Sequence, residues 1–234
     1  MLSVLLAGAG CTSSPDNERS QPTGSTQPDV GAIFTDRARD LGLDFVHFNG
    51  MSGERFLSEI MGAGAALFDY DNDGDLDVYL VQGTMLGDGR KFEDAMSPYR
   101  GDRPPKDRLY RNDLSETGQI HFTDITQPSE IEAIGYGMGV AAGDIDNDGR
   151  PDVYVANMYS KAGERIVDNL KRGVYPDDID AQMRDFVSGN ELYHNLGEGR
   201  FERVGQATGV ADVGWAYGPG FVDLDNDGWP DLFV

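Results

Sequence analysis

The stretch DYDNDGDLD at residues 69–77 recurs as DIDNDGRPD at residues 144–152 and as DLDNDGWPD at residues 223–231. Each copy has acidic residues at loop positions 1, 3, 5 and 9 and a glycine at position 6. Four carboxylates this close together repel one another unless a cation lies among them. Ca²⁺ takes about six to eight oxygen ligands from alternate side chains and a main-chain carbonyl, and glycine allows the sharp turn that this requires. The spacing therefore predicts three calcium-binding loops.

The EF-hand is one alternative for this spacing. It needs a glutamate at position 12 and a helix on each side, whereas position 12 here is Leu80, Val155 and Val234. The residues after each loop are β-branched or aromatic, which favours a strand. We therefore expect the loops to connect strands, with the aspartate at position 9 as the closing ligand. An acidic, solvated turn is the second alternative, because Asp-Gly and Asn-Asp also suit turns. Repetition in register favours the metal.

The rest of the chain repeats with the loops. Their first residues lie 75 and 79 positions apart, LYRN at 109–112 recurs as LYHN at 192–195, and a glycine stands five residues before each loop. Short strands and Gly-rich turns in a repeated unit predict the blades of a β-propeller, an all-β fold. The strands expected beside the loops are residues 65–68, 78–82, 140–143, 153–157, 221–222 and 232–234. A hairpin is expected at residues 197–201, GEGRF.

Two segments interrupt the repeat. Gly83 to Lys106 is rich in glycine, proline and charge and is interpreted as a long loop between strands. Residues 161–189 are interpreted as an insertion with a short helix. Its apolar residues at helical spacing are Ile179, Met183, Phe186 and Val187. Since propellers close with about four to eight blades, and the sequence stops in the strand after the third loop, we expect it to be part of a longer protein.

The first residues are typical of an export signal. MLSVLLAGAG at residues 1–10 is an apolar run before Cys11, as at the end of a bacterial lipoprotein signal peptide. This predicts a signal over residues 1–11 with lipidation of Cys11; an ordinary secretory signal and a chance apolar start are the alternatives. Residues 12–29 are rich in Ser, Thr, Pro and Gln and are expected to form a disordered tether. The repeats then occupy residues 30–234.

The composition narrows the possible partners. The chain has a formal net charge of −22, and the three loops hold thirteen of its 41 acidic residues. Such a chain disfavours DNA and RNA, whose binding needs basic patches. Solubility alone also accounts for the acidic residues outside the loops. With one cysteine the chain forms no internal disulfide, so bound metal is the expected staple. No stretch has the length and apolarity of a transmembrane helix.

These features resemble the FG-GAP/VCBS repeat family, whose calcium-loop blades also occur in integrin α-subunits. With FVHFNG at 45–50 and EIMGAG at 59–64, they resemble bacterial relatives of cartilage acidic protein, which often carry a C-terminal ASPIC/UnbV domain. The resemblance covers about residues 30–234 and implies an exported propeller with Ca²⁺ in each blade. The ligands that it implies are the carboxylates of Asp69, Asp71, Asp73, Asp77, Asp144, Asp146, Asp148, Asp152, Asp223, Asp225, Asp227 and Asp231, and the carbonyls of Asp75, Arg150 and Trp229.

No catalytic constellation is evident in the sequence. Its histidines are His47, His121 and His194, and the last two are interpreted as structural or surface residues in strands. Glu54, Arg55 and Glu59 cluster near the first repeat and are interpreted as a solvated turn with salt bridges; a place on the central face of the propeller is the alternative. We therefore expect a non-catalytic binding or adhesion module for a protein or glycan ligand, secreted or on the cell envelope, with the membrane reached only through a lipid anchor.

Two alternatives to this function remain open. One is the scaffold of an extracellular carbohydrate-active enzyme, whose carboxylate pair only geometry can locate. The other is a stability module for a C-terminal ASPIC/UnbV-type domain.

Overall fold

The computed structural model describes residues 34–86, 90–131, 135–158, 189–214 and 216–234. The chain divides into two units, Met1–Asp36 and Arg37–Val234. In the first unit only residues 34–36 are described, and all three are exposed. Cys11, the predicted signal and tether, and the predicted insertion up to residue 188 lie outside the described residues.

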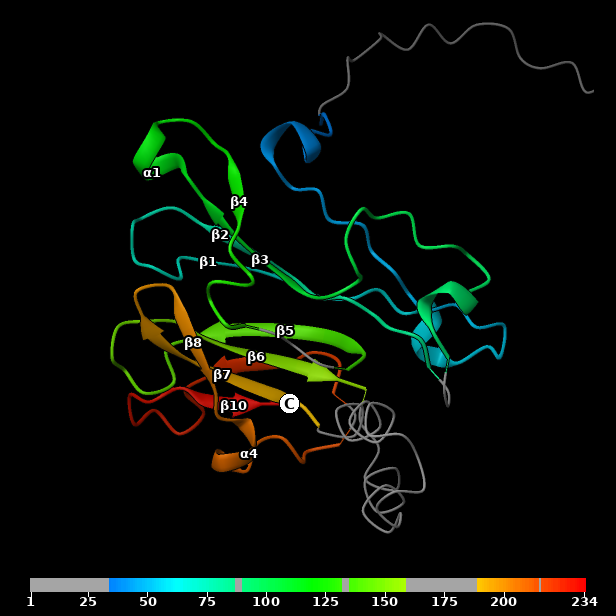
Figure 1. Cartoon of the computed structure of the whole chain (residues 1–234). Helices are drawn as coiled ribbons and strands as arrows, with labels where there is room; N and C mark the ends of the chain where they lie inside the picture. The colour runs from blue at the N-terminus through cyan, green and yellow to red at the C-terminus, as the bar shows by residue number, and fades with distance from the viewer. Residues whose placement is uncertain (1–33, 87–89, 132–134, 159–188, 215) are drawn as a thin grey trace, which may run out of the picture. The chain divides into compact units, whose positions relative to one another are not determined.

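The described part of the second unit is an all-β structure of short antiparallel strands (Figure 1). The first sheet contains, in chain order, β1 (Ala65–Phe68), β2 (Asp77–Leu80), β3 (Arg108–Asn112) and β4 (Phe122–Asp124). The second contains β5 (Gly137–Gly143), β6 (Asp152–Asn157), β7 (Glu191–Gly197) and β8 (Arg200–Arg203). The third pairs β9 (Gly220–Val222) with β10 (Asp231–Phe233). The predicted all-β class is confirmed, while the described residues do not close into a propeller.

All helices among the described residues are single turns. They are η1 (Arg39–Leu41), η2 (Leu57–Ile60), η3 (Phe92–Asp94), α1 (Leu114–Thr117) and α4 (Gly205–Thr208). The third lies inside the segment 83–106 that was predicted to be a plain loop. Among the described residues, no helix combines the length and the apolarity needed to cross a membrane.

The three loops occupy one register in three hairpins. In each hairpin, the residue before the loop pairs with the aspartate at loop position 9; the pairs are Phe68 with Asp77, Gly143 with Asp152, and Val222 with Asp231. The strands that follow the loops therefore begin at position 9, one residue earlier than the sequence predicted. The EF-hand alternative is wrong for the same reason, since a strand flanks the loop on both sides.

The β7–β8 hairpin confirms the turn expected at residues 197–201. Its two central residues, Glu198 and Gly199, have φ values of 53° and 74°. Positive φ at both central positions is the geometry that matches the twist of a two-residue hairpin.

The main hydrophobic core joins the first two sheets. Its fully buried residues come from β2, β3, β6, β7 and β8 and the segments beside them; they include Tyr79, Val81, Leu109, Val153, Val155, Tyr193 and Phe201. Burying one large apolar side chain contributes about 1.5–3 kcal/mol. Since these residues come from both sheets, a single core supports the β1–β2 and β5–β6 hairpins, which carry the first two loops.

Two of the repeated glycines explain how closely the first strands of successive sheets approach. A Cβ atom on Gly64 would lie 2.9 Å from Cα of Gly139, and a Cβ atom on Gly139 would lie 2.2 Å from the carbonyl oxygen of Tyr217. No larger side chain fits without a shift of the backbone. The glycine repeat therefore lets β5 pack against β1 on one side and β9 on the other.

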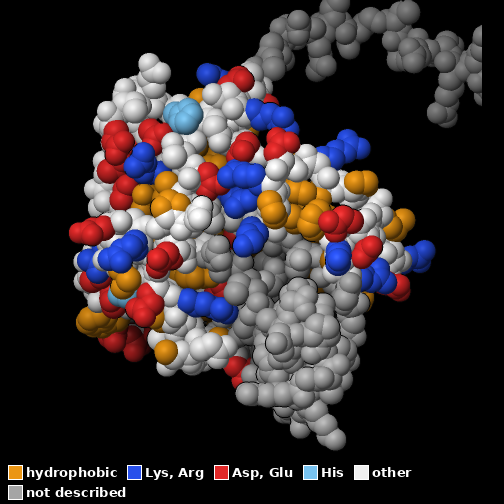
Figure 2. All heavy atoms as spheres, viewed as in Figure 1, with side chains coloured by type: hydrophobic (Ala, Val, Ile, Leu, Met, Phe, Trp, Pro, Cys, Tyr) orange, Lys and Arg blue, Asp and Glu red, His pale blue; other side chains and the backbone are white. Residues whose placement is uncertain are grey.

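Basic side chains are interspersed among the acidic ones on the face drawn in Figure 2. Among the described residues, several basic groups pair with carboxylates; Arg103 contacts both Asp44 and Asp124, and Arg111 contacts Asp113. The excess negative charge is therefore partly compensated on the described surface, outside the three loops.

Candidate metal-binding loops

The backbone of each loop is bent in the same way at positions 4 and 6. The asparagines at position 4, Asn72, Asn147 and Asn226, have φ values of 60°, 55° and 61°, and the glycines at position 6 have φ values between 88° and 92°. Asparagine is among the few residues that adopt this left-handed conformation readily, and glycine adopts it without a steric penalty. The Asn-Asp-Gly core of the motif thus encodes the fold of the loop.

The aspartate at position 1 holds this bend in place. Both carboxylate oxygens of Asp69 accept main-chain N–H groups, from Asp73 at 3.0 Å and from Gly74 at 3.0 Å. Asp144 and Asp223 make the same pair of bonds in their own loops, at 2.8–3.1 Å. The first carboxylate is consequently fixed by the backbone and directed into the loop.

The aspartate at position 9 joins the loop to the strand behind it. Asp77 is fully buried, and its oxygens accept the N–H of Tyr70 at 2.9 Å and the N–H of Asn112 at 2.8 Å. Asp152 repeats this arrangement with Ile145 and Asn195. The main-chain N–H of the asparagine in each Leu-Tyr-x-Asn strand thus anchors a loop carboxylate, and its side-chain amide donates to the carbonyl at loop position 8. Sequence reasoning missed this role although the repeat contains the signal.

These bonds bring three acidic groups together in each loop. Ligand atoms lie within 4.8 Å of one another in three sets of aspartates: Asp69, Asp71 and Asp77; Asp144, Asp146 and Asp148; and Asp223, Asp225 and Asp231. The structure thus gathers nine of the twelve aspartates predicted to bind through their carboxylates. All the gathered donors are hard oxygens, which fit Ca²⁺.

Three predicted ligands lie outside their own loop's set. Asp73 accepts hydrogen bonds from Ser115 Oγ and from the N–H of Asp75, and Asp227 accepts the N–H of Trp229 at 2.8 Å. Asp152 groups instead with Asp146 and with His194 of β7, a residue that the sequence had assigned a structural or surface role.

Two residues at position 7 carry side chains that affect their loops. Arg150 pairs with Asp148 and donates from Nε to the carbonyl of Asn195 at 2.9 Å. Asp75 is buried, and its Oδ2 accepts the N–H of Ser115 at 2.7 Å, whereas its Oδ1 has no hydrogen-bond partner among the described residues. A buried carboxylate oxygen without a donor is costly, and a nearby cation would reduce that cost.

Burial makes several loop carboxylates difficult to ionise. It raises the pKa of Asp77 to about 7; the two N–H donors lower this pKa in part, and the charges of Asp71 and Asp73 raise it further. Burial, followed by the charge of Asp73, also raises the pKa of Asp71, and burial raises the pKa of Asp152. The opposite holds for Asp73, because the hydrogen bond from Ser115 lowers its pKa. The buried ends of the loops therefore favour a positive partner.

Successive loops are linked by side-chain amides. Nδ2 of Asn72 donates to the carbonyl of Gly149 at 2.8 Å, and Nδ2 of Asn147 donates to the carbonyl of Gly228 at 3.0 Å. Position 4 of one loop thus holds position 6 of the next. In addition, Asn195 Nδ2 donates to the carbonyl of Tyr70 at 2.9 Å, which ties β7 to the first loop.

One sequence interpretation outside the loops is wrong. Residues 54–59 were interpreted as a solvated turn, and this describes Glu54, which is exposed and pairs with Arg90 at 3.0 Å. Glu59 instead is buried and accepts hydrogen bonds from the N–H and Oγ of Ser52. Both donors come from Ser52, seven residues earlier in the chain, so the carboxylate is held by a local contact rather than solvated.

Comparison with known protein families gives one match. A family model described as FG-GAP-like repeat matches residues 69–155 and 178–234, which together are more than half of the chain. The two matched spans contain all three loops. No curated protein matches the sequence.

Proposed function

Since this chain belongs to the FG-GAP-like repeat family, we propose that it is an exported, calcium-stabilised β-propeller module. The observation that carries the proposal is the convergence of three aspartates in each of three loops built alike. Ca²⁺ would supply the positive charge that lets these carboxylates remain ionised side by side.

The proposed ligands are those that the loop pattern assigns. In each loop they are the carboxylates at positions 1, 3, 5 and 9 and the carbonyl at position 7. Asp73 and Asp227 belong to this set only if their side chains turn from their present partners when the ion binds. The main-chain bonds of Asp69 and Asp77 keep the remaining carboxylates of the first loop in place.

The propeller is proposed on the packing of the strands. The first strand of each sheet contacts the first strand of the next, β1 with β5 and β5 with β9. The first and second sheets are both meanders of four consecutive strands. Radial repetition of such meanders is the design of a propeller. Small-angle scattering of the whole protein tests this, because a closed ring and an extended array differ in radius of gyration.

The module is proposed to act by binding rather than by catalysis. One cavity among the described residues, lined by Phe45, Gln82, Tyr99 and Arg103 among others, has a volume of about 10 Å³, about enough for one water molecule. It is too small for an organic substrate. A protein or glycan ligand is proposed to bind the outer surface, since the sequence shows no catalytic constellation. Nucleic acid is not proposed, because the net charge of −22 repels it.

Export is proposed from the first residues of the sequence, and lipidation at Cys11 is its specific form. Fractionation of cells expressing the chain, with Cys11→Ala as the comparison, tests both. Loss of the membrane-associated fraction in the variant supports the anchor, whereas an unchanged distribution argues against it.

Calcium analysis tests the central part of the proposal. The purified protein, dialysed against millimolar Ca²⁺, is expected to retain about one ion per loop. Absence of bound calcium under these conditions would contradict the proposed function.

A further inference from the structure

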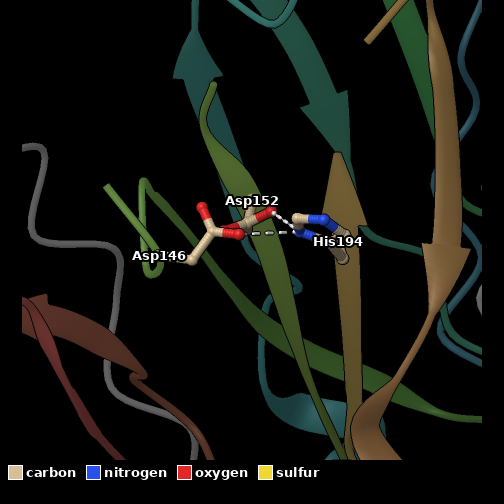
Figure 3. A group of neighbouring side chains, drawn as sticks. All are labelled: Asp146, Asp152 and His194. Atoms are coloured by element: carbon tan, nitrogen blue, oxygen red, sulfur yellow. Dashed lines mark hydrogen bonds and ion pairs between the residues drawn. The ribbon is translucent and has the colours of Figure 1, made fainter. Parts of the chain in front are cut away.

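The second loop differs from the other two by the side chain that faces it. Nδ1 of His194, on β7, lies 3.1 Å from Oδ1 of Asp152 and 3.8 Å from Oδ2 of Asp146 (Figure 3). The three ligand atoms all lie within 4.8 Å of one another, and this is the one such group among the described residues that contains a nitrogen donor.

These separations fit one small ion. Two ligands bound at about 2.0–2.1 Å lie about 3 Å apart at a right angle and about 4 Å apart on opposite sides of the metal. The measured 3.1 and 3.8 Å fall within that range, and the 3.1 Å contact is a His194–Asp152 hydrogen bond that a bound ion would replace. The side chain of Asp152 is 1% exposed, whereas those of His194 and Asp146 are 27% and 46% exposed. An ion can therefore enter from solvent and reach a carboxylate at the buried end.

The cationic side chain of the second loop itself, Arg150, has other partners. Arg150 pairs with Asp148 and donates to the carbonyl of Asn195. Asp152 itself is held by the N–H groups of Ile145 and Asn195, so its carboxylate is already oriented.

Comparison with the first loop shows that the histidine is particular to the second. Arg111 occupies the corresponding place in the Leu-Tyr-x-Asn strand, and its guanidinium donates to Asp113 rather than to a loop carboxylate. The corresponding ligand set, Asp69, Asp71 and Asp77, offers oxygen alone.

We propose that Asp146, Asp152 and His194 form a site for a first-row transition-metal ion of the zinc class, distinct in selectivity from the first and third loops. Imidazole nitrogen suits Zn²⁺, Ni²⁺ and Cu²⁺, whereas Ca²⁺ takes oxygen ligands. The inference rests on the proposed metal-binding role of the loops. It predicts that Zn²⁺ displaces Ca²⁺ from the second loop alone, because Asp146 and Asp152 belong to both ligand sets.

Calorimetric titration of the untagged full chain with Zn²⁺, in millimolar Ca²⁺, tests the proposal. The wild-type protein is expected to bind one Zn²⁺, and His194→Asn is expected to weaken that binding by tenfold or more. His121→Asn is the matched control, since His121 Nδ1 lies 3.1 Å from Asp113, a carboxylate outside the loops. It should leave the Zn²⁺ affinity unchanged.

A second measurement needs no substitution. In ¹⁵N-detected spectra of the three histidine rings, Zn²⁺ should shift the ring nitrogens of His194 and leave those of His121 unchanged. Equal Zn²⁺ affinity in the wild type and His194→Asn, absence of Zn²⁺ binding, or an equal loss in both variants would overturn the inference. Zn²⁺ binding that depends on His194 in a protein that binds no Ca²⁺ would instead overturn the proposed function and leave this inference standing.

Discussion

Asn72 and Gly149, 77 positions apart in the chain, are joined by a 2.8 Å hydrogen bond from the side-chain amide to the carbonyl oxygen. The bond connects position 4 of the first loop to position 6 of the second, and Asn147 repeats it toward the third. The acidic loops therefore form a connected series along one edge of successive sheets, and disturbance of one loop is expected to affect the next.

Removal of this link should lower stability without disturbing the turn. Asn72→Gly retains the freedom to adopt the φ of 60° but loses the amide. We expect it to lower the free energy of unfolding in EDTA by about 0.5–1.5 kcal/mol, measured by urea denaturation. Asn226→Gly is the control, because Asn226 has φ 61° and makes no side-chain bond to another described loop. An equal effect of both substitutions would show that the link contributes nothing.

A methyl group at one repeated glycine should be far more disruptive than at another. Gly139→Ala places a Cβ atom 2.2 Å from the Tyr217 carbonyl, whereas a Cβ atom on Gly218 meets no atom within 4 Å. Overpacking of this kind costs about 1–3 kcal/mol. Thermal melts should show a clear loss for Gly139→Ala and little change for Gly218→Ala. Two equal melting temperatures would contradict the close packing of β5 against its neighbours.

Neutralising a loop carboxylate should lower the stability of the protein in calcium but not in EDTA. Asp71→Asn is expected to remove about one bound Ca²⁺ per chain and so lower the melting temperature in calcium. In EDTA the same variant should be as stable as the wild type or more stable, because a charge beside Asp69 and Asp73 is gone. Glu93→Gln, an exposed acid outside the loops, should change neither quantity. A loss of stability in both conditions would point to a structural role for Asp71 unrelated to metal.

A buried acid outside the loops should make stability depend on pH. Burial raises the pKa of Asp107 to about 7, although the N–H of Gln82 and the hydroxyl of Tyr79 partly offset the effect. Between about pH 4 and pH 7 the unfolded chain releases this proton while the folded chain keeps it, so the free energy of unfolding falls as pH rises.

Asp107→Asn should remove this dependence. Relative to the wild type, the variant is expected to gain on the order of 2–4 kcal/mol between pH 5 and pH 8, measured by denaturant unfolding. The second repeat already has an asparagine at the equivalent place. Oδ1 of Asn190 accepts the N–H of Asn157 at 2.7 Å, just as Oδ1 of Asp107 accepts the N–H of Gln82. Parallel pH profiles for the two proteins would refute the assignment.

The sequence predicts the local structure of the loops well because their determinants lie within nine residues. Asn72 and Gly74 set the bend, Asp69 caps it, and the alternating residues that follow form a strand, so both the hairpins and the acidic clusters were predictable. The one-residue error in strand starts arises because Asp77 is at once a ligand candidate and a paired strand residue.

Contacts between distant segments could not be predicted in the same way. His194 reaches back to Asp152 over 42 positions of the chain, and Ser115 likewise reaches back to Asp73 over 42 positions. Neither spacing follows from a local pattern. Each depends on how β3 or β7 aligns with its neighbour and on the turn that follows. The anchoring asparagines, by contrast, repeat in register and could have been found from Asn112 and Asn195.

A thermal melt of the full chain in millimolar Ca²⁺ and in EDTA, at matched ionic strength, tests the central claim most directly. Ligand at a hundredfold excess over its dissociation constant stabilises by about 2.7 kcal/mol per site, which for a domain of this size raises the melting temperature by about 5 °C or more. We expect at least that increase in calcium, with no comparable effect of added Na⁺. Coincident melts in the two buffers would contradict the claim that the loops are structural calcium sites.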